Sequence, residues 1–178
     1  ANGRVVIIPN QGVVYKLNQH LLVPANTTIE GVGNPTLQYT AQGQSNVGAI
    51  QTSGVNVTLR GFTIDGGSLL ASPPGSNTFG LNVKHDGFRG DDLVIRHTMS
   101  RGVDFYQVDD CKLRNSKVVD NNSTGIRMTA CSKIDLIDID VSRNYNSFGI
   151  WPVNGTHDCR LEGIIMRNMD NPYVSLEC

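Results

Sequence analysis

Three side chains with complementary chemistry recur at equivalent positions of a phrase that the sequence repeats. The phrase is a glycine, an apolar residue, a variable residue and a second apolar residue, and its copies begin at Gly80, Gly102, Gly125 and Gly149. The variable position holds Asp104, Arg127 and Trp151 in the last three copies. A carboxylate accepts or donates a proton, a guanidinium binds an anion in a fork, and an indole offers a flat apolar face. This combination is typical of a groove that binds a saccharide.

A second row of polar and aromatic side chains lies two residues further along each copy, on the same side of the strand. The first row is predicted as Ile50, Asn82, Asp104, Arg127, Trp151 and Ser175, and the second as Thr52, Lys84, Tyr106, Thr129, Val153 and Glu177. His85 follows at the end of one strand. The candidate catalytic residues are Asp104, Arg127, Tyr106 and Lys84. The candidate substrate-binding residues are Trp151, Asn82, His85 and Glu177.

The spacing of the phrase predicts the scaffold that positions these side chains. Its copies are 22, 23 and 24 residues apart, and self-similarity at a period of about 20–50 residues marks a stacked solenoid. Each unit holds two or three short alternating apolar runs and no helical period, which indicates strands. We therefore predict an all-β protein, a parallel β-helix of about seven coils of 22–24 residues, in a single domain over residues 1–178.

A second repeated phrase sets the register of the coils. We align Leu59, Ile95, Leu113, Leu136 and Leu161, and the residues two positions earlier are Val57, Leu93, Cys111, Ile134 and Cys159. Both columns are apolar and should face the core. The residues two positions later tolerate a positive φ angle, which predicts a bend at Gly61, His97, Asn115, Asp138 and Gly163. Asn121 and Asn144 also occupy equivalent positions, eight residues after Leu113 and Leu136. They form either a stacked amide ladder or two unrelated surface residues.

The opening of the chain resembles a known superfamily. Residues 3–9 (GRVVIIP), 14–17 (VYKL) and 22–33 (LVPANTTIEGVG) look like the first coil of pectate-lyase-like right-handed β-helix proteins. That superfamily includes polysaccharide lyases, glycoside hydrolases, uronan epimerases and phage tailspikes. The resemblance implies a right-handed helix with a substrate groove along the outward face of the first strands. Such proteins usually carry a capping helix, so we expect a segment of a longer protein without its caps, or ends that other copies cover.

Two kinds of catalysis fit the candidate residues. Hydrolysis needs two carboxylates, about 5–5.5 Å apart for retention or about 6.5–9.5 Å apart for inversion. Asp104 is one, and Asp86, Asp109 or Asp110 would be nearest to it. β-Elimination needs a base and a cation that neutralises a uronate carboxylate, and Arg127, Lys84, Tyr106 and His85 offer such groups. Binding without catalysis is a third interpretation, and the plainest is a polar sheet with one Arg–Asp pair between strands.

Two classes of function follow from the predicted fold. The first is a carbohydrate-active protein outside the cell, on a cell surface or on a virion, with a polysaccharide or glycan as its partner. The second is a structural or adhesive module that forms homo-oligomers or stacks end to end into a filament. Missing caps favour the second class, as do five Asn-x-Ser/Thr acceptors for glycosylation at Asn26, Asn56, Asn121, Asn122 and Asn154.

Composition argues against several other classes. The net charge of −1 offers no basic field for nucleic acid, and no run of 18 apolar residues predicts a membrane span. We expect no cofactor; paired aspartates suggest calcium only weakly, because no loop has the ligand density of a calcium motif, and no metal-binding spacing occurs. Cys111 and Cys159 lie two coils apart, about 9–10 Å by strand spacing. A disulfide needs Cα atoms within about 7 Å, so we predict buried thiols there.

Overall fold

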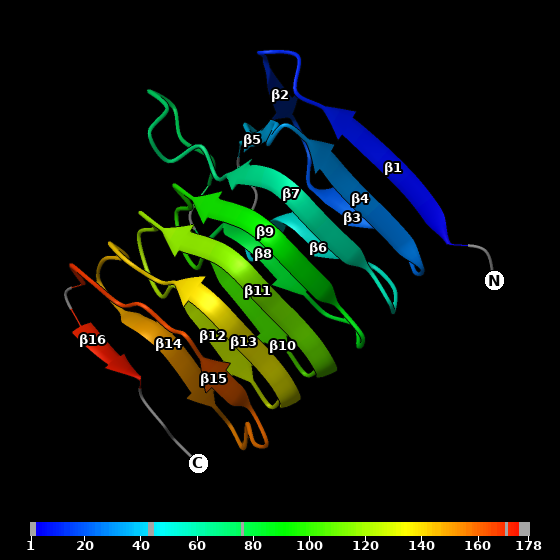
Figure 1. Cartoon of the computed structure of the whole chain (residues 1–178). Helices are drawn as coiled ribbons and strands as arrows, with labels where there is room; N and C mark the ends of the chain where they lie inside the picture. The colour runs from blue at the N-terminus through cyan, green and yellow to red at the C-terminus, as the bar shows by residue number, and fades with distance from the viewer. Residues whose placement is uncertain (1–2, 43–44, 76, 170, 175–178) are drawn as a thin grey trace.

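The protein is a two-layered parallel β-solenoid of about seven turns (Figure 1). The computed structural model describes residues 3–42, 45–75, 77–169 and 171–174. Every strand pairing in these ranges is parallel, and they contain no helix. The predicted fold class is therefore confirmed. None of these residues belongs to a helix long and apolar enough to cross a membrane.

The solenoid is built from two sheets that we call sheet A and sheet B. Sheet A contains β1 (Arg4–Pro9), β2 (Val14–Leu17), β4 (Thr27–Val32), β5 (Thr36–Tyr39), β7 (Thr58–Asp65), β9 (Arg89–Arg96), β11 (Asp109–Val119), β13 (Ser132–Asp140) and β15 (Arg160–Glu162). Sheet B contains β3 (Leu21–Val23), β6 (Gly48–Thr52), β8 (Phe79–Val83), β10 (Val103–Tyr106), β12 (Ile126–Thr129), β14 (Phe148–Val153) and β16 (Asn171–Val174).

From β8 onward, the register of sheet B is the one predicted from the sequence. Leu81, Val103, Ile126 and Ile150 are cross-strand partners, and all four are fully buried in the core. The residues that follow them therefore point outward, as predicted.

The predicted register of β6 is wrong by one residue. Ile50 pairs with Leu81 and is fully buried, and the outward partner of Asn82 is Gln51. Thr52 is buried as well. The residue equivalent to Gly80 is Ala49, because Gly48 pairs with Phe79 and Ile50 with Leu81. A shift of one residue moves every side chain of a strand to the other face.

The predicted register of sheet A is correct in four coils and wrong in one. The partner of Leu59 and Leu113 is Gly90, five residues before Ile95. The bend column is accordingly Gly61, Asp92, Asn115, Asp138 and Gly163, and all five have positive φ angles. His97 also has a positive φ angle but belongs to another column, with Asp120 and Arg143.

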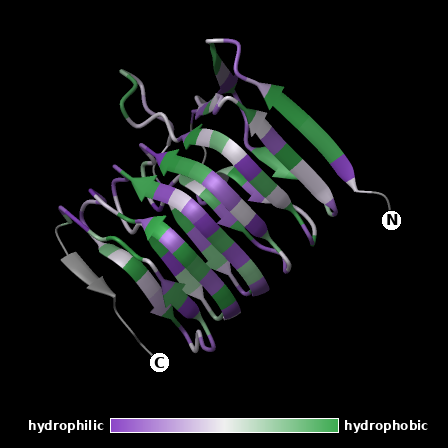
Figure 2. Ribbon diagram, viewed as in Figure 1, coloured by the Kyte–Doolittle hydropathy of each residue, from purple (hydrophilic) through white to green (hydrophobic). Residues whose placement is uncertain are grey.

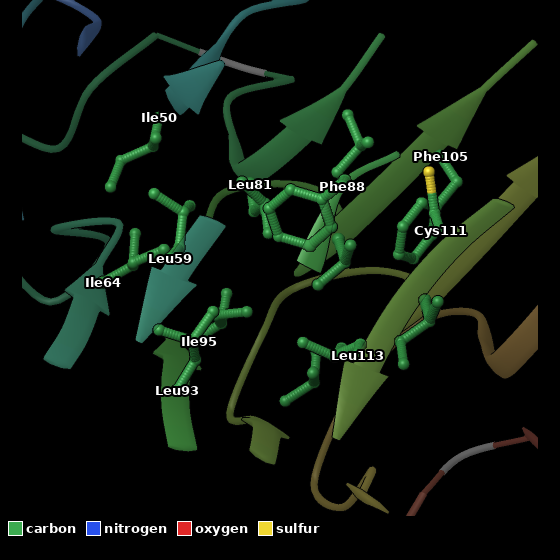
Figure 3. Close-up of a cluster of buried hydrophobic side chains, with 14 of the residues drawn as sticks. Ile50, Leu59, Ile64, Leu81, Phe88, Leu93, Ile95, Phe105, Cys111 and Leu113 are labelled. Carbon is green, nitrogen blue, oxygen red and sulfur yellow. The ribbon is translucent and has the colours of Figure 1, made fainter. Parts of the chain in front are cut away.

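Packing between Phe88 and Gly90 explains this error. Figure 3 shows Phe88 within the core, among the buried side chains that include Phe105 and Leu113. Phe88 is fully buried and packs edge-on against Phe105, with ring centroids 6.2 Å apart. A Cβ atom on Gly90 would lie 3.1 Å from the Phe88 ring and 2.6 Å from Leu113 Cδ1. The large ring at one position therefore requires a glycine two residues later, and the pair of apolar residues sought by the alignment does not occur there.

The amide ladder exists, and it lies inside the solenoid. Asn121 Nδ2 donates to Asn144 Oδ1 over 2.8 Å, and Asn144 Nδ2 donates to the Val118 carbonyl over 2.8 Å. Thr98 extends the ladder by donating its hydroxyl to Asn121 Oδ1 over 2.8 Å. Both asparagines are fully buried. The ladder satisfies backbone groups at the corner where sheet A leads into sheet B.

The first strand exposes three apolar side chains. Val6 pairs with the buried Ile29 at an inward position, whereas Val5 and Ile7 pair with Thr28 and Glu30 at outward positions. Val5, Val6 and Ile7 of β1 are between 47% and 64% exposed, and Figure 2 shows β1 as hydrophobic along most of its length. Within the described residues β1 pairs with β4 alone. Its other edge therefore presents unpaired backbone groups beside an apolar surface.

Three cysteines are free thiols, as predicted for Cys111 and Cys159. Cys111 and Cys131 are buried, whereas Cys159 in the last coil is half-buried. Burial raises the pKa of the Cys111 thiol to about 12 and raises the pKa values of the other two. Cys178 lies outside the described residues.

Candidate functional site

The candidate site occupies the outward face of sheet B. Register places Asn82, Asp104, Arg127 and Trp151 on successive strands β8, β10, β12 and β14 as direct neighbours in one row. Gln51 of β6 continues this row, and its Oε1 accepts a hydrogen bond from Asn82 Nδ2 over 3.3 Å. The structure thus brings together four of the predicted site residues and adds Gln51.

Asp104 is the centre of this row. It is 4% exposed, and its two oxygens lie 3.2 Å from Arg127 Nε and 3.8 Å from Arg101 Nη1. Burial raises the pKa of the Asp104 carboxyl, against the opposing attraction of Arg101, Arg127 and Lys84. The cost of desolvating the carboxylate therefore exceeds the stabilisation that the three cations provide.

Arg101 is a site residue that the sequence analysis missed. It precedes Gly102, and its guanidinium stacks on the Phe79 ring, 4.9 Å from the centroid. Burial lowers its pKa, while Asp104 acts in the opposite direction. A signal was present: strict alternation from Val103 would turn residue 101 inward, and an arginine at a core position is a conflict. The chain bends at Gly102, immediately before β10, so the alternation does not continue to Arg101, whose guanidinium contacts Asp104 and Phe79 on the outward face.

Arg127 lies between Asp104 and Trp151 and interacts with both. Its Nε–H hydrogen is donated to Thr129 Oγ1 over 2.9 Å, so Asp104 Oδ1 is ion-paired with the guanidinium without accepting a hydrogen bond from it. The guanidinium carbon lies 5.9 Å from the centroid of the Trp151 ring. Trp151 in turn packs against Phe148, with centroids 5.3 Å apart. Arg101 and Arg127 therefore each pair one aromatic ring with the same carboxylate.

Three buried polar atoms along the row lack hydrogen-bond partners within the described part of the chain. They are Asn82 Oδ1, Asp104 Oδ1 and Trp151 Nε1. Most buried polar atoms in folded proteins are hydrogen-bonded, and an unpaired one costs about 1–3 kcal/mol. Two of these atoms are acceptors and one is a donor. Each has almost no solvent-accessible surface, so a ligand with hydroxyl hydrogens and oxygen acceptors reaches them only when neighbouring side chains move.

An open depression of about 340 Å³ lies over the site. Predicted residues in its lining are Asn82, Lys84, Asp104, Tyr106 and Arg127; Arg101, Phe79 and Asn46 complete it. Tyr106 is 41% exposed, so its ring and hydroxyl are accessible to a ligand. Asp104 is the single carboxylate in the described lining.

The remaining candidates lie elsewhere. His85 is in the turn after β8, where its Nδ1 contacts the Thr52 carbonyl over 3.2 Å, and it does not line the depression. Glu177 and Ser175 lie outside the described residues.

The carboxylates considered as partners of Asp104 have structural contacts of their own. Asp86 Oδ1 accepts a hydrogen bond from the Asp109 backbone over 2.9 Å, and Asp109 Oδ1 accepts one from the Ser132 backbone over 3.1 Å. Asp110 is paired with Arg89 at 2.9 Å. None of the three lines the depression.

The glycosylation acceptors differ in access. Asn26, Asn56, Asn122 and Asn154 are exposed. Asn121 is fully buried and its side-chain amide donates to Asn144, so the folded chain has no room for a glycan there. No group of three or more histidine, cysteine, aspartate or glutamate side chains that could hold a metal ion occurs in the described residues.

Comparisons with known proteins agree with the architecture. No protein family and no curated protein matches the chain. A solved structure, the ORF18 protein of Geobacillus virus E2, is similar with a TM-score of 0.59 and 14% sequence identity. The shared property is the fold. The similarity covers 94% of this chain and 40% of that protein, so the chain spans less than half of its length.

Proposed function

We propose that the outward face of sheet B binds a polysaccharide, with Asn82, Asp104, Arg127 and Trp151 as the central contacts. The observation that carries this proposal is the row of three unpartnered polar atoms beside two arginine–aromatic pairs. Sugars present hydroxyl groups on their edges and apolar C–H groups on their faces. Such a ligand would cover the aromatic rings, and side-chain movement on binding would bring its hydroxyl groups to the unpaired atoms.

The direction of the ligand follows from the register. Adjacent strands of a sheet are about 4.8 Å apart, so Asn82 and Trp151, three strands from each other, are separated by about 14 Å. A chain that contacts both residues must run along the solenoid axis, across the strands. This geometry favours a polymer over a single sugar.

The charge of the site favours an acidic sugar. Lys84, Arg101 and Arg127 surround the one carboxylate of the described lining. Three cations and one anion leave a surplus of positive charge, and a guanidinium binds a carboxylate in a fork. A uronate would place its carboxylate beside these cations.

The same arrangement favours β-elimination over hydrolysis for any cleavage at this site. Hydrolysis requires a second carboxylate, which the described lining of the depression does not contain. Elimination requires cations that neutralise the uronate carboxylate and a group that removes the adjacent proton, and Arg127, Lys84, Tyr106 and Asp104 offer these functions.

The place of action that we propose is outside the cell or on a virion. The similarity to a protein of Geobacillus virus E2 supports a virion, because a solenoid of the same architecture belongs to a virus. A polymeric sugar ligand is also a component of cell surfaces, which a virion protein must contact.

A second candidate function is axial self-assembly, favoured by the exposed apolar residues of β1 and the unpaired edge of that strand. A second solenoid could add its last coil in parallel to this edge. Sedimentation velocity over a range of concentrations tests this candidate. We expect concentration-dependent association in the wild type and its loss in a Val6→Lys variant, because Val6 is exposed at an inward position of β1. A monomer at every concentration would refute this candidate.

The binding proposal is tested by incubation with a panel of uronans and neutral polysaccharides. Absorbance of unsaturated uronate products and release of reducing ends are followed together, with binding measured by co-sedimentation. We expect binding of acidic polymers, and loss of binding in Arg127→Ala and Asp104→Ala. Arg143→Ala, at an arginine that pairs with Asp120 and does not line the depression, is the matched control and should behave as the wild type. Equal binding by all four proteins would refute the proposal.

A further inference from the structure

A second hollow lies on the outward face of sheet A, over β7, β9 and β11. Figure 1 shows these three strands side by side in front of the strands of sheet B. The volume of the hollow is about 290 Å³. Its charged lining consists of Arg60, Arg89, Lys112, Arg114 and Asp91. Four cations thus surround one carboxylate.

The strand register places two of these cations directly opposite each other. Arg89 and Lys112 are cross-strand partners on β9 and β11, with both side chains on the outward face. Like charges at directly opposed positions of a sheet destabilise it. A local arrangement that opposes stability is the kind of position at which a binding function is expected.

The counter-charges of three of the cations lie at the rim, outside the hollow. Arg60 pairs with Glu30 at 2.6 Å, Arg89 with Asp110 at 2.9 Å and Lys112 with Asp135 at 2.9 Å. These three carboxylates do not line the hollow. Arg89 also donates to the backbone carbonyls of Phe88 and Asp110, so both of its terminal nitrogens are used. Arg60 and Lys112 each make one carboxylate contact and keep further N–H donors.

The fourth cation is paired inside the hollow. Arg114 Nη2 lies 3.2 Å from Asp91 Oδ2, and Asn115 Nδ2 donates to the other oxygen of Asp91 over 2.9 Å. Arg60 and Arg114 each use one terminal nitrogen for a carboxylate. A guanidinium has five N–H donors in a planar fork, so each retains donors that match a tetrahedral or planar oxyanion.

We propose that this hollow binds an oxyanion, a sulfate, phosphate or carboxylate group, through Arg60, Lys112 and Arg114, with the charge of Arg89 beside them. Each cation already has a carboxylate partner, so the ligand uses the donors that these pairs leave free on Arg60, Lys112 and Arg114. The group can arrive as a free ion or as a substituent of a polymer, and the chemistry of recognition is the same in both cases.

Calorimetric titration at constant ionic strength tests the proposal on the whole chain, with sodium sulfate and sodium phosphate as free ions and sodium chloride as the reference. Dextran sulfate and uncharged dextran test the polymer-borne group. We expect saturable binding of at least one anionic probe and none of chloride or dextran. Binding of the free ions assigns the site to an ion, and binding of dextran sulfate alone assigns it to a polymer substituent.

Two variants with opposite expected effects separate a binding site from a structural ladder of ion pairs. Arg114→Gln should weaken binding about tenfold, the scale for losing one charge-assisted contact. Asp91→Asn removes the one negative charge of the described lining and should tighten binding a few-fold. Arg143→Gln, an ion-paired arginine outside the hollow, should leave binding unchanged, and Lys112→Gln replaces Arg114→Gln if that variant does not fold. No binding of any anion, or equal affinity in wild type, Arg114→Gln and Asp91→Asn, overturns the proposal.

Discussion

Arg127 Nε lies 3.2 Å from Asp104 Oδ1, yet the hydrogen on this nitrogen is donated to Thr129 Oγ1. The Asp104 carboxylate is consequently buried beside a cation without the hydrogen bond that usually accompanies such a pair. Its pKa is raised because burial exceeds the attraction of the neighbouring cations. The site therefore holds a carboxyl group with one unpaired oxygen, which can bind a proton or accept a hydrogen bond from a ligand hydroxyl.

The raised pKa of Asp104 predicts the sign of a pH effect on stability. A carboxyl whose pKa is higher in the folded state than in the unfolded state stabilises the fold at low pH, and this contribution is lost as the pH rises through the folded pKa. Relative to Asp104→Asn, which mimics the protonated form, the wild type should lose unfolding free energy as the pH rises from below the unfolded pKa of about 3.9 through the raised folded pKa. Urea denaturation of both proteins measures the difference, and a relative gain by the wild type would contradict the assignment.

Asp120 and Arg143 should show the opposite sign. Arg143 donates two hydrogen bonds, of 2.7 and 2.8 Å, to the Asp120 carboxylate and lowers its pKa. This contribution is present above the unfolded pKa, about 3.9, and is lost as the pH falls through the folded pKa. Because the pair is partly exposed to solvent, we expect less than about 1 kcal/mol. The wild type should lose stability relative to Asp120→Asn on acidification, and an unchanged difference would show that the pair contributes nothing.

The sequence predicted most of the scaffold because it repeats with a nearly constant period. The glycine phrase gave the correct register from Leu81 to Ile150, since the inward residues are apolar in every coil. It failed where two coils depart from the pattern: Ala49 replaces the glycine in one, and Phe88 with Gly90 replaces two aliphatic residues in the other. Both substitutions conserve the filling of the core while they change the residues that an alignment compares.

The candidate site was predicted in part. Asp104, Arg127 and Trp151 share a row because their spacing equals the period. Arg101 was missed because the chain bends at Gly102, immediately before β10, and alternation does not continue through a bend. The hydrogen bond from Arg127 to Thr129 and the unpaired atoms depend on side-chain conformation, which residue spacing does not determine.

The large Phe88 and the small Gly90, which pack together in the core, provide a test of the corrected register. Phe88→Ala should cost about 3–5 kcal/mol of unfolding free energy, because it leaves a cavity beside Phe105. Gly90→Ala should cost about 1–3 kcal/mol, because the added Cβ contacts Phe88 and Leu113. The double variant Phe88→Leu/Gly90→Ala should lose less unfolding free energy than the single variants Phe88→Leu and Gly90→Ala lose together. We expect the difference to be about 0.5–3 kcal/mol. Strict additivity in urea denaturation would contradict direct packing of residues 88 and 90.

The buried amide ladder should be sensitive to the loss of one member. Asn144→Ala removes the acceptor of Asn121 Nδ2 and the donor to the Val118 carbonyl. Leaving these buried groups unpaired should cost about 1–3 kcal/mol. Exposed Asn122 on the same corner is the matched control, and Asn122→Ala should cost less than about 0.5 kcal/mol. Equal effects of the two substitutions would show that the ladder does not contribute to stability.

The most direct test of glycan binding uses Trp151, the sole tryptophan of the chain. Its indole lies in the candidate row with an unpartnered Nε1, so its fluorescence reports occupancy of this site. Titration with an acidic oligosaccharide should give a saturable change in emission, about tenfold weaker in Arg127→Ala, which corresponds to ~1.4 kcal/mol. Sulfate titrated to the hollow on sheet A should leave the emission unchanged. Co-sedimentation with a polysaccharide without any change in Trp151 emission would contradict the assignment of binding to sheet B.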